Sequence, residues 1–81
     1  MIKITVKCFS QVRYALGIDI LNLEFESGTS TSQLEKFIRG KANGKLDGIS
    51  LRIALNQKYV PDETELQDGD EVSFIPPVQG G

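Results

Sequence analysis

The group best placed to do chemistry is the C-terminal carboxylate, because the chain ends on two residues that have no side chain. The last six positions are Pro76, Pro77, Val78, Gln79, Gly80 and Gly81. The two prolines fix φ and lack N–H donors, so they end any preceding strand and send the chain away extended. At up to about 3.3–3.6 Å per residue, residues 77–81 can carry the carboxylate roughly 15 Å from the body of the domain. We therefore predict a tail that enters a channel, with glycines where a Cβ would collide.

Few other groups in the sequence could support catalysis. There is no histidine, which removes the usual general base near neutral pH and the commonest metal ligand. Cys8 is the only cysteine and follows an alternating apolar pattern, so we expect a buried small hydrophobe rather than a reactive thiol, a disulfide or a metal ligand. An unactivated carboxylate is a poor acyl donor. We therefore predict no metal site and no self-sufficient enzyme, and we expect the tail to need activation by a partner and a nucleotide.

Length and composition indicate one small globular domain. Of the 81 residues, 40% are hydrophobic and 25% are charged, as in ordinary soluble domains. Nine basic and eleven acidic residues give a formal charge of −2, which argues against nucleic-acid binding. The apolar runs fall far short of the roughly 20 residues that span a bilayer, and the N-terminus lacks the apolar region of a signal peptide. We expect a cytoplasmic (cytosolic) protein with no membrane association.

The N-terminal part of the chain reads as strand, short helix, strand. Apolar residues alternate with polar ones from Ile2 to Cys8, which is typical of a half-buried strand. Ser10 is placed to cap a helix over residues 11–16, which Gly17 would end in the left-handed conformation. Residues 18–25 then alternate as a second strand.

The main helix is predicted over residues 29–39. A capping box marks its start, formed either by Ser30 with Gln33 or by Ser32 with Glu35. The apolar stripe that would face a sheet consists of Leu34, Phe37 and Ile38.

The remaining segments are predicted to add strands to the same sheet. Residues 40–48 are rich in glycine and polar side chains and are expected to form a surface loop. A strand at 51–55 then leads through a turn into a short strand at 58–60. A second turn at 68–70 precedes the last strand at 71–75.

This order of elements predicts an α+β fold of the β-grasp (ubiquitin-like) type. A mixed sheet of four to five strands would pack on one main helix, with the first and last strands parallel at its centre. The domain would comprise residues 1–76, and residues 77–81 would form a flexible C-terminal tail. Fold alone does not indicate function.

Three hydrophobic residues near the start of the tail are predicted to face away from the core. If the first strand buries its apolar face, Phe9 lies on the opposite side, and the same alternation in the last strand turns Ile75 outward. Tyr59, on the short strand, is the third candidate. Isolated exposed hydrophobes are ordinary on protein surfaces. The alternative is that Phe9, Tyr59 and Ile75 form an apolar patch on which a partner docks.

The sequence resembles the small, sulfur-carrying subunits of molybdopterin synthase, over essentially the whole chain. The resemblance is carried by Phe-Ser-Gln-Val-Arg at 9–13, Ala-Leu-Asn-Gln at 54–57, and Asp-Gly-Asp-Glu-Val at 68–72 followed by the six terminal residues. A Gly-Gly end alone is shared with ubiquitin and its relatives. Diproline followed by Val-X-Gly-Gly in a chain of this length is much more specific.

The resemblance implies a carrier whose Gly81 carboxylate is adenylated by an E1-like enzyme using ATP, and then converted to a thiocarboxylate by sulfur from a persulfide donor. The tail, from Pro76 to Gly80, would enter the active site of the large synthase subunit, and Gly81 would give its sulfur to cyclic pyranopterin monophosphate. Two such transfers would build the dithiolene of molybdopterin. The large subunit would supply the catalytic side chains, this chain would bind no cofactor, and two small and two large subunits would form a heterotetramer. The family's interface positions fall on Phe9, Tyr59 and Ile75.

Other functions remain open at this point. Sulfur carriers of the thiamin pathway or of tRNA thiolation share the tail, although the diproline and the Asn56-Gln57 turn favour neither. A ubiquitin-like modifier of lysines needs the same tail and activation, and would be recognised by an isopeptide rather than a thiocarboxylate at Gly81. The remaining alternative is a β-grasp interaction module with an inert tail.

Overall fold

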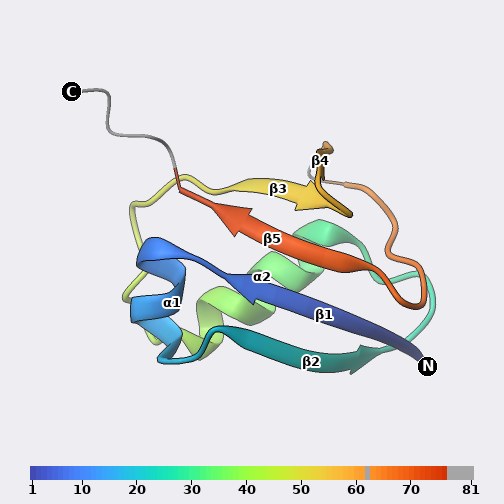
Figure 1. The fold of residues 1–81 in the computed structure, drawn as a ribbon, viewed down its shortest axis with the longest axis horizontal. Helices are drawn as coiled ribbons and strands as arrows, with labels where there is room; N and C mark the ends of the chain where they lie inside the picture. Colours follow the sequence, from blue (N-terminus) through green and yellow to red (C-terminus); the bar gives the residue numbers. More distant parts are fainter. Residues whose placement is uncertain (62, 77–81) are drawn as a thin grey trace.

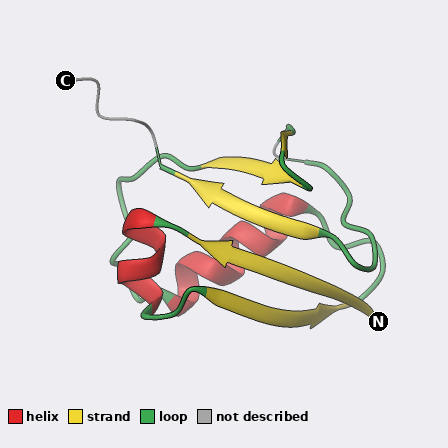
Figure 2. Ribbon diagram, in the orientation of Figure 1, coloured by secondary structure: helices red, strands yellow, loops and turns green. Residues whose placement is uncertain are grey.

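The computed structural model describes residues 1–61 and 63–76. Within them the elements are β1 (Ile2–Cys8), α1 (Ser10–Leu16), β2 (Ile20–Phe25), α2 (Thr31–Lys41), β3 (Arg52–Leu55), β4 (Lys58–Tyr59) and β5 (Glu71–Ile75). The strands form one sheet in the order β2-β1-β5-β3-β4, in which β1 and β5 run parallel and all other neighbours antiparallel. α2 crosses one face of this sheet and α1 lies at one end of it (Figure 1, Figure 2). The predicted α+β β-grasp fold is confirmed, including the central parallel pair.

The core lies between the sheet and α2, and its position follows from the alternation of the strands. Val6 on β1 and Val72 and Phe74 on β5 have no exposed surface, and Leu34 and Ile38 of α2 pack in the same cluster. Burying a side chain of this size stabilises a fold by about 1.5–3 kcal/mol. β5, from which the tail continues, is therefore held on one face by the core and on both edges by hydrogen-bonded neighbours.

The two helices begin in different ways. α2 has the predicted capping box, in which the Gln33 backbone N–H donates to Ser30 Oγ at 3.3 Å and the Ser30 N–H donates to Gln33 Oε1 at 2.8 Å. For α1 the prediction that Ser10 is the N-cap is wrong. The N-cap is Phe9, whose carbonyl accepts from Val12 N at 3.0 Å, so the backbone alone closes the first turn. The C-terminal end of α1 is as predicted, because Gly17 adopts a left-handed φ of 72°.

Phe37 of the predicted apolar stripe packs against the edge strand β2 and not over the centre of the sheet. It is 40% exposed and contacts Phe25 edge-to-face, with ring centroids 5.4 Å apart. The face of α2 that is buried instead contains Thr31, Leu34 and Ile38. Phe37 is therefore at the flank of the buried face, where it covers the margin of the core.

The segment after α2 is more buried than predicted. α2 continues to Lys41, and Leu46, in the middle of the supposed surface loop, is buried. The Arg39 guanidinium holds this segment, because Nη1 donates to the Leu46 carbonyl at 2.7 Å and Nη2 donates to the Ile49 carbonyl at 2.6 Å. Glu35 Oε2 accepts from Arg39 Nε at 2.9 Å and orients the side chain.

A buried carboxylate fixes the place where β5 begins. Asp70 accepts from Gln67 N at 2.7 Å and from Asn56 Nδ2 at 2.9 Å, while Asn56 Oδ1 accepts from the Glu71 N–H at 3.0 Å. The Asp70 carbonyl accepts from Thr5 N on β1 at 3.0 Å. One short segment thus ties β5 to β1 and to the β3–β4 turn, and sets the alignment of the strand that leads to the tail.

Candidate functional site

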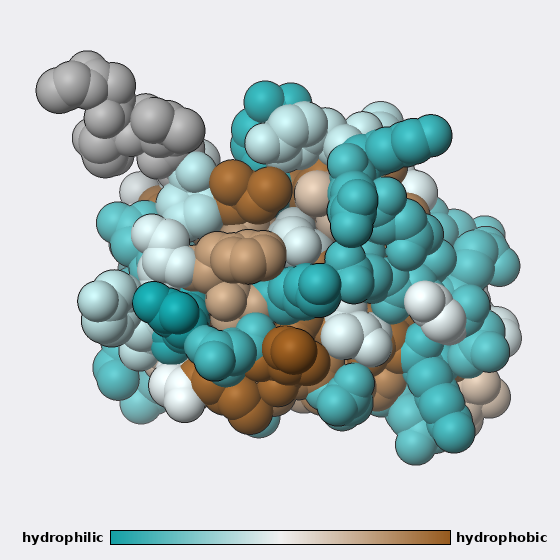
Figure 3. All heavy atoms as spheres, viewed as in Figure 1, coloured by the Kyte–Doolittle hydropathy of each residue, from teal (hydrophilic) through white to brown (hydrophobic). Residues whose placement is uncertain are grey.

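The face of the sheet that α2 does not cover carries the candidate site. Backbone pairing places Lys7, Ser73, Ala54 and Tyr59 side by side in one row across β1, β5, β3 and β4. In the next row Arg52 pairs with Ile75. Figure 3 shows hydrophobic side chains gathered on the half of this face where β1 and β5 end, whereas hydrophilic ones dominate the other half.

Of the three predicted interface residues, Phe9 and Ile75 lie on this half of the sheet. Phe9 is 50% exposed and Tyr59 is 56% exposed, while Ile75 is half-buried. Phe9 follows Cys8, which pairs with Phe74, so Phe9 stands next to the end of β5. Tyr59 lies farther across the sheet, on its edge strand. Their proposed role in binding a partner stays a prediction.

Two residues of this surface were not singled out from the sequence. The Arg52 guanidinium carbon lies 4.0 Å from the centroid of the Tyr59 ring. Ala54, opposite Tyr59, is only 6% exposed although it lies on the outer face. The alternation of residues 51–55 already placed Arg52 and Ala54 on that face, but the contact with Tyr59 depends on how β3 and β4 pair. Phe9, Arg52, Tyr59 and Ile75 are called the exit patch below.

Charges around the exit patch are mostly paired. Lys7 Nζ lies 3.3 Å from Glu71 Oε2, and both side chains are partly exposed. Arg13 at α1 lies 3.7 Å from Asp19. Such exposed pairs contribute little to stability, but they leave Arg52 as the cation of the exit patch that has no carboxylate within ion-pair distance among residues 1–61 and 63–76.

The chain leaves the sheet at Pro76, which follows β5 directly and is half-buried. Because proline has no N–H, the ladder of β5 cannot continue through it. The other predicted tail residues, Pro77, Val78, Gln79 and Gly80, and the predicted reactive residue Gly81 lie outside the described residues. The end of β5 nevertheless lies at the end of the sheet where α1 begins (Figure 1).

The described part of the chain offers little catalytic chemistry of its own. Cys8 is buried, and burial, with a smaller contribution from the Asp19 carboxylate, raises the pKa of its thiol above the ordinary value of 9.0. Within the same residues no group of histidine, cysteine or carboxylate side chains is arranged to hold a metal ion. None of the helices in the described ranges has the length and apolar character needed to cross a membrane.

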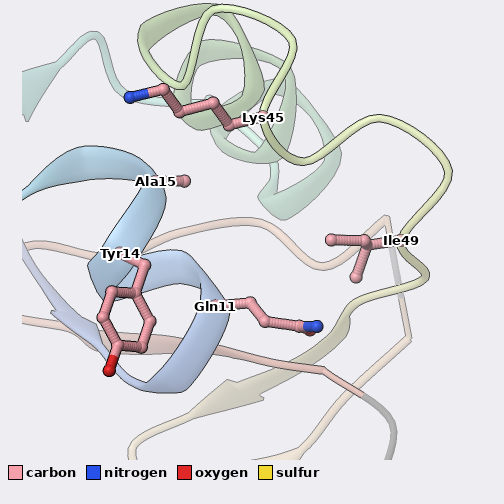
Figure 4. Close-up of a pocket in the computed structure, with 5 residues that line it drawn as sticks. All are labelled: Gln11, Tyr14, Ala15, Lys45 and Ile49. Atoms are coloured by element: carbon pink, nitrogen blue, oxygen red, sulfur yellow. The ribbon is translucent and has the colours of Figure 1, made fainter.

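A hollow of about 260 Å³ between α1 and the segment before β3 does not have the features of a ligand-binding site. Its lining residues are Gln11, Tyr14, Ala15, Lys45 and Ile49. In Figure 4 the Tyr14 hydroxyl, the Gln11 amide and the Lys45 amine point in different directions. A site that binds a small molecule needs polar groups that converge on it, so this hollow carries no functional assignment.

Comparison with known proteins shows matches over the full chain. The model of the ThiS family matches residues 6–81. The molybdopterin synthase sulfur carrier subunit of Haemophilus influenzae is 34% identical over 80 residues, covering 96% of this chain and 99% of the relative. The protein of the same name from Mycobacterium tuberculosis is 37% identical over 83 residues, with 100% of both chains covered.

Solved structures of similar proteins share the fold. Subunit 1 of a molybdopterin converting factor from Pyrococcus furiosus matches with a TM-score of 0.86 at 30% identity, covering 96% of this chain and 100% of that one. Small archaeal modifier protein 1 from Methanosarcina acetivorans matches with a TM-score of 0.78 at 27% identity, covering 100% and 98%. A complex of subunits 1 and 2 of the molybdopterin-converting factor from Helicobacter pylori contains a chain that matches with a TM-score of 0.69 at 23% identity, covering 99% and 100%.

Proposed function

Because the chain belongs to the ThiS family, we propose that it is a sulfur carrier of molybdenum cofactor biosynthesis. The observation that carries this proposal is the extent of the match. Two relatives named molybdopterin synthase sulfur carrier subunit align with nearly the whole chain, and the family match runs through residue 81, so it includes the Gly-Gly end.

In the proposed reaction the only reacting group of this chain is the carboxylate of Gly81. An E1-like enzyme would adenylate it with ATP, and the outer sulfur of a persulfide donor would displace AMP to form an acyl disulfide. A thiol of the activating partner would then reduce the S–S bond, which leaves the thiocarboxylate on Gly81 and a disulfide on the partner. The tail would then give this sulfur to cyclic pyranopterin monophosphate in the active site of the large synthase subunit. The buried thiol of Cys8 and the lack of a metal-binding group within residues 1–61 and 63–76 support a role in which the partners supply the catalysis, the ATP site and any cofactor.

The proposed partner of the exit patch is the large synthase subunit. The Helicobacter pylori protein of the same fold was solved as a complex of subunits 1 and 2, which supports a partner of this kind. Phe9, Tyr59 and Ile75 would contact it beside the tail, and two copies of each subunit would form a heterotetramer. We place the protein in the cytosol, without nucleic-acid or membrane partners.

Intact-mass spectrometry tests the carrier function directly. After incubation with the E1-like enzyme, ATP and a sulfur donor, the mass of the full chain should increase by one exchange of oxygen for sulfur. A variant that lacks only Gly81 retains every described residue and is the matched control, and its mass should not change. An unchanged mass of the full chain, with an enzyme that loads another carrier in the same assay, would refute the proposal.

A second candidate function is conjugation to lysine side chains. It is favoured by the match to a small archaeal modifier protein at 27% identity, because that protein has the same fold and is named for a different activity. The two functions differ in the product at Gly81. Mass spectrometry of tryptic peptides from cells would find an isopeptide to a target lysine for a modifier and a thiocarboxylate for a carrier. Sulfur carriers of the thiamin pathway or of tRNA thiolation would be distinguished by the acceptor that receives the sulfur.

A further inference from the structure

We propose that Arg52, held over the ring of Tyr59, determines which partner the exit patch accepts, by pairing with a carboxylate on the large synthase subunit. The inference rests on the proposed function and deepens it. It names the chemistry that the partner must present, which is an acidic side chain next to a hydrophobic surface.

The position of Arg52 is set by the pairing of three strands. Arg52 pairs with Ile75 at the end of β5, and Tyr59 pairs with Ala54, which is two residues beyond Arg52 on the same face of β3. The guanidinium carbon of Arg52 lies 4.0 Å from the Tyr59 ring centroid. The charge is therefore held beside the last residue of β5, at the point from which the tail continues.

Contact with the ring does not occupy the N–H donors of the Arg52 guanidinium. A guanidinium is planar and carries its five N–H donors along its edges, so an aromatic ring on one face does not block them. Within residues 1–61 and 63–76, the Arg52 side chain donates no hydrogen bond and has no carboxylate within ion-pair distance, whereas Lys7 and Arg13 both have one. An oriented fork of donors next to Phe9 and Ile75 is the arrangement that binds a carboxylate bidentately.

The charge of the exit patch and the restraint of the Arg52 side chain by Tyr59 both favour a protein carboxylate as the group that Arg52 binds. The chain as a whole has a charge of −2, which disfavours a polyanion. The exit patch carries the positive charge of Arg52, whereas the nearby Lys7 is paired with Glu71. Arginine and tyrosine are also enriched among the residues that dominate binding at protein interfaces. Since Tyr59 already restrains the Arg52 side chain, less conformational entropy is lost when a partner binds.

Binding of the full chain to the large subunit from the same organism tests the inference, by isothermal titration at low and at high salt. Arg52→Glu should weaken binding by about 10- to 100-fold at low salt, because one favourable charge pair becomes repulsive. Arg52→Met should weaken it less and reduce its salt dependence. Lys58→Glu makes the same charge change on the opposite face of β4 and should change affinity by less than about twofold, as expected for a charge outside the interface. Urea unfolding of each variant shows whether the domain remains folded.

A Phe9→Asp variant separates the two possible failures. If Phe9→Asp weakens binding and Arg52→Glu does not, the role of Arg52 is refuted while the exit patch remains the docking surface. If neither variant weakens binding, both the exit patch and the role of Arg52 are refuted, whereas the mass assay still judges the carrier function independently. An equal loss in Arg52→Glu and Lys58→Glu would also refute the inference, because the effect would then be one of net charge.

Discussion

Replacing Asp70 with alanine should destabilise the domain by about 3 kcal/mol, because its buried carboxylate holds the start of β5. Asp70 is 7% exposed and accepts hydrogen bonds from Gln67 N at 2.7 Å and Asn56 Nδ2 at 2.9 Å. Hydrogen bonds to charged groups contribute about 1.5–3 kcal/mol each, and a buried donor that loses its acceptor costs about 1–3 kcal/mol. Two such bonds at the lower limit give the expected loss. For 81 residues the total stability is of the order of 4–12 kcal/mol, so the change is a large fraction of it.

Urea unfolding at neutral pH measures this loss, with two control variants. Asp70→Asn keeps one acceptor oxygen and should lose about half as much as Asp70→Ala. Asp68→Ala removes an acceptor in the same turn, since Asp68 Oδ1 accepts from Lys3 N at 2.7 Å, but this bond is exposed and should contribute about 1 kcal/mol or less. The slope of the unfolding free energy against urea must be equal in all variants for the comparison to hold.

The reasoning would be refuted if Asp70→Ala and Asp68→Ala lost the same stability. That result would mean that burial adds nothing to the Asp70 bonds and that the alignment of β5 is set by core packing alone. If instead Asp70→Asn lost as much as Asp70→Ala, the negative charge, rather than the number of acceptors, would be the stabilising feature.

Two further predictions concern the turn after β3 and the buried thiol. Gln57 has a φ of 71° without being glycine. For a residue with a side chain this left-handed conformation costs about 1–2 kcal/mol, whereas the extra freedom of a glycine in the unfolded chain costs about 0.5–1 kcal/mol. Gln57→Gly should therefore raise the free energy of unfolding by about 0.5–1 kcal/mol, while Lys58→Gly in the adjacent strand should lower it. Burial, and to a smaller extent Asp19, raises the pKa of the Cys8 thiol in the folded state. The unfolded chain therefore loses this proton at a lower pH than the folded one. Stability should fall as the pH rises above 9.0, the ordinary pKa of the thiol. Urea unfolding at neutral and alkaline pH should show a smaller fall in Cys8→Ala, and an equal fall in both proteins would contradict this.

The strands β1, β2 and β5 could be predicted because each has one face that is more buried than the other. When one side of a strand faces the core and the other faces water, the alternation of residues records which is which, and the alternating residues of β1 have the predicted burial. The helical stripe was less informative, because a helix buries a broad sector. Phe37 is on the edge of that sector, and Thr31, which is polar, takes a fully buried place in it. Hydrophobicity alone cannot distinguish the centre of a buried face from its flank.

Long-range contacts account for the features that the sequence did not indicate. Leu46 stands alone among polar residues, and its burial accompanies the contact of Arg39 with its carbonyl from the preceding helix. Asp70 is buried because Asn56, on a different turn, supplies one of its donors. Neither partner is identifiable from local spacing. Asn56 and Asp70 meet through the pairing of β3 with β5, and Arg39 reaches the Leu46 carbonyl because the segment after α2 folds back on the helix.

The candidate site also has a part that the sequence predicted and a part that it did not. Alternation was sufficient to place Phe9 and Ile75 on the outer face, because Ile75 ends β5 and Phe9 directly follows β1, and both strands have a clear apolar side. Arg52 was on that face too, but its contact with Tyr59 follows from the pairing of Ala54 with Tyr59, which no pattern within either strand reveals. The part of the site that can be read from one strand was therefore predicted, and the part that requires two strands was not.

The fixed end of β5 explains why binding and stability should respond to different substitutions. Phe74 is fully buried and pairs with Cys8 on one side and Ile53 on the other, whereas Pro76 cannot extend the ladder. A partner that takes up the tail therefore acts on a strand that is fixed up to its last residue, and the sheet itself has no need to move. Arg52 joins the two regions, because its backbone pairs with Ile75 while its side chain lies over Tyr59 on the outer face, where we propose that the partner binds. Substitutions at Arg52 should change affinity without destabilising the domain, and substitutions at Asp70 should destabilise it without altering a residue of the exit patch.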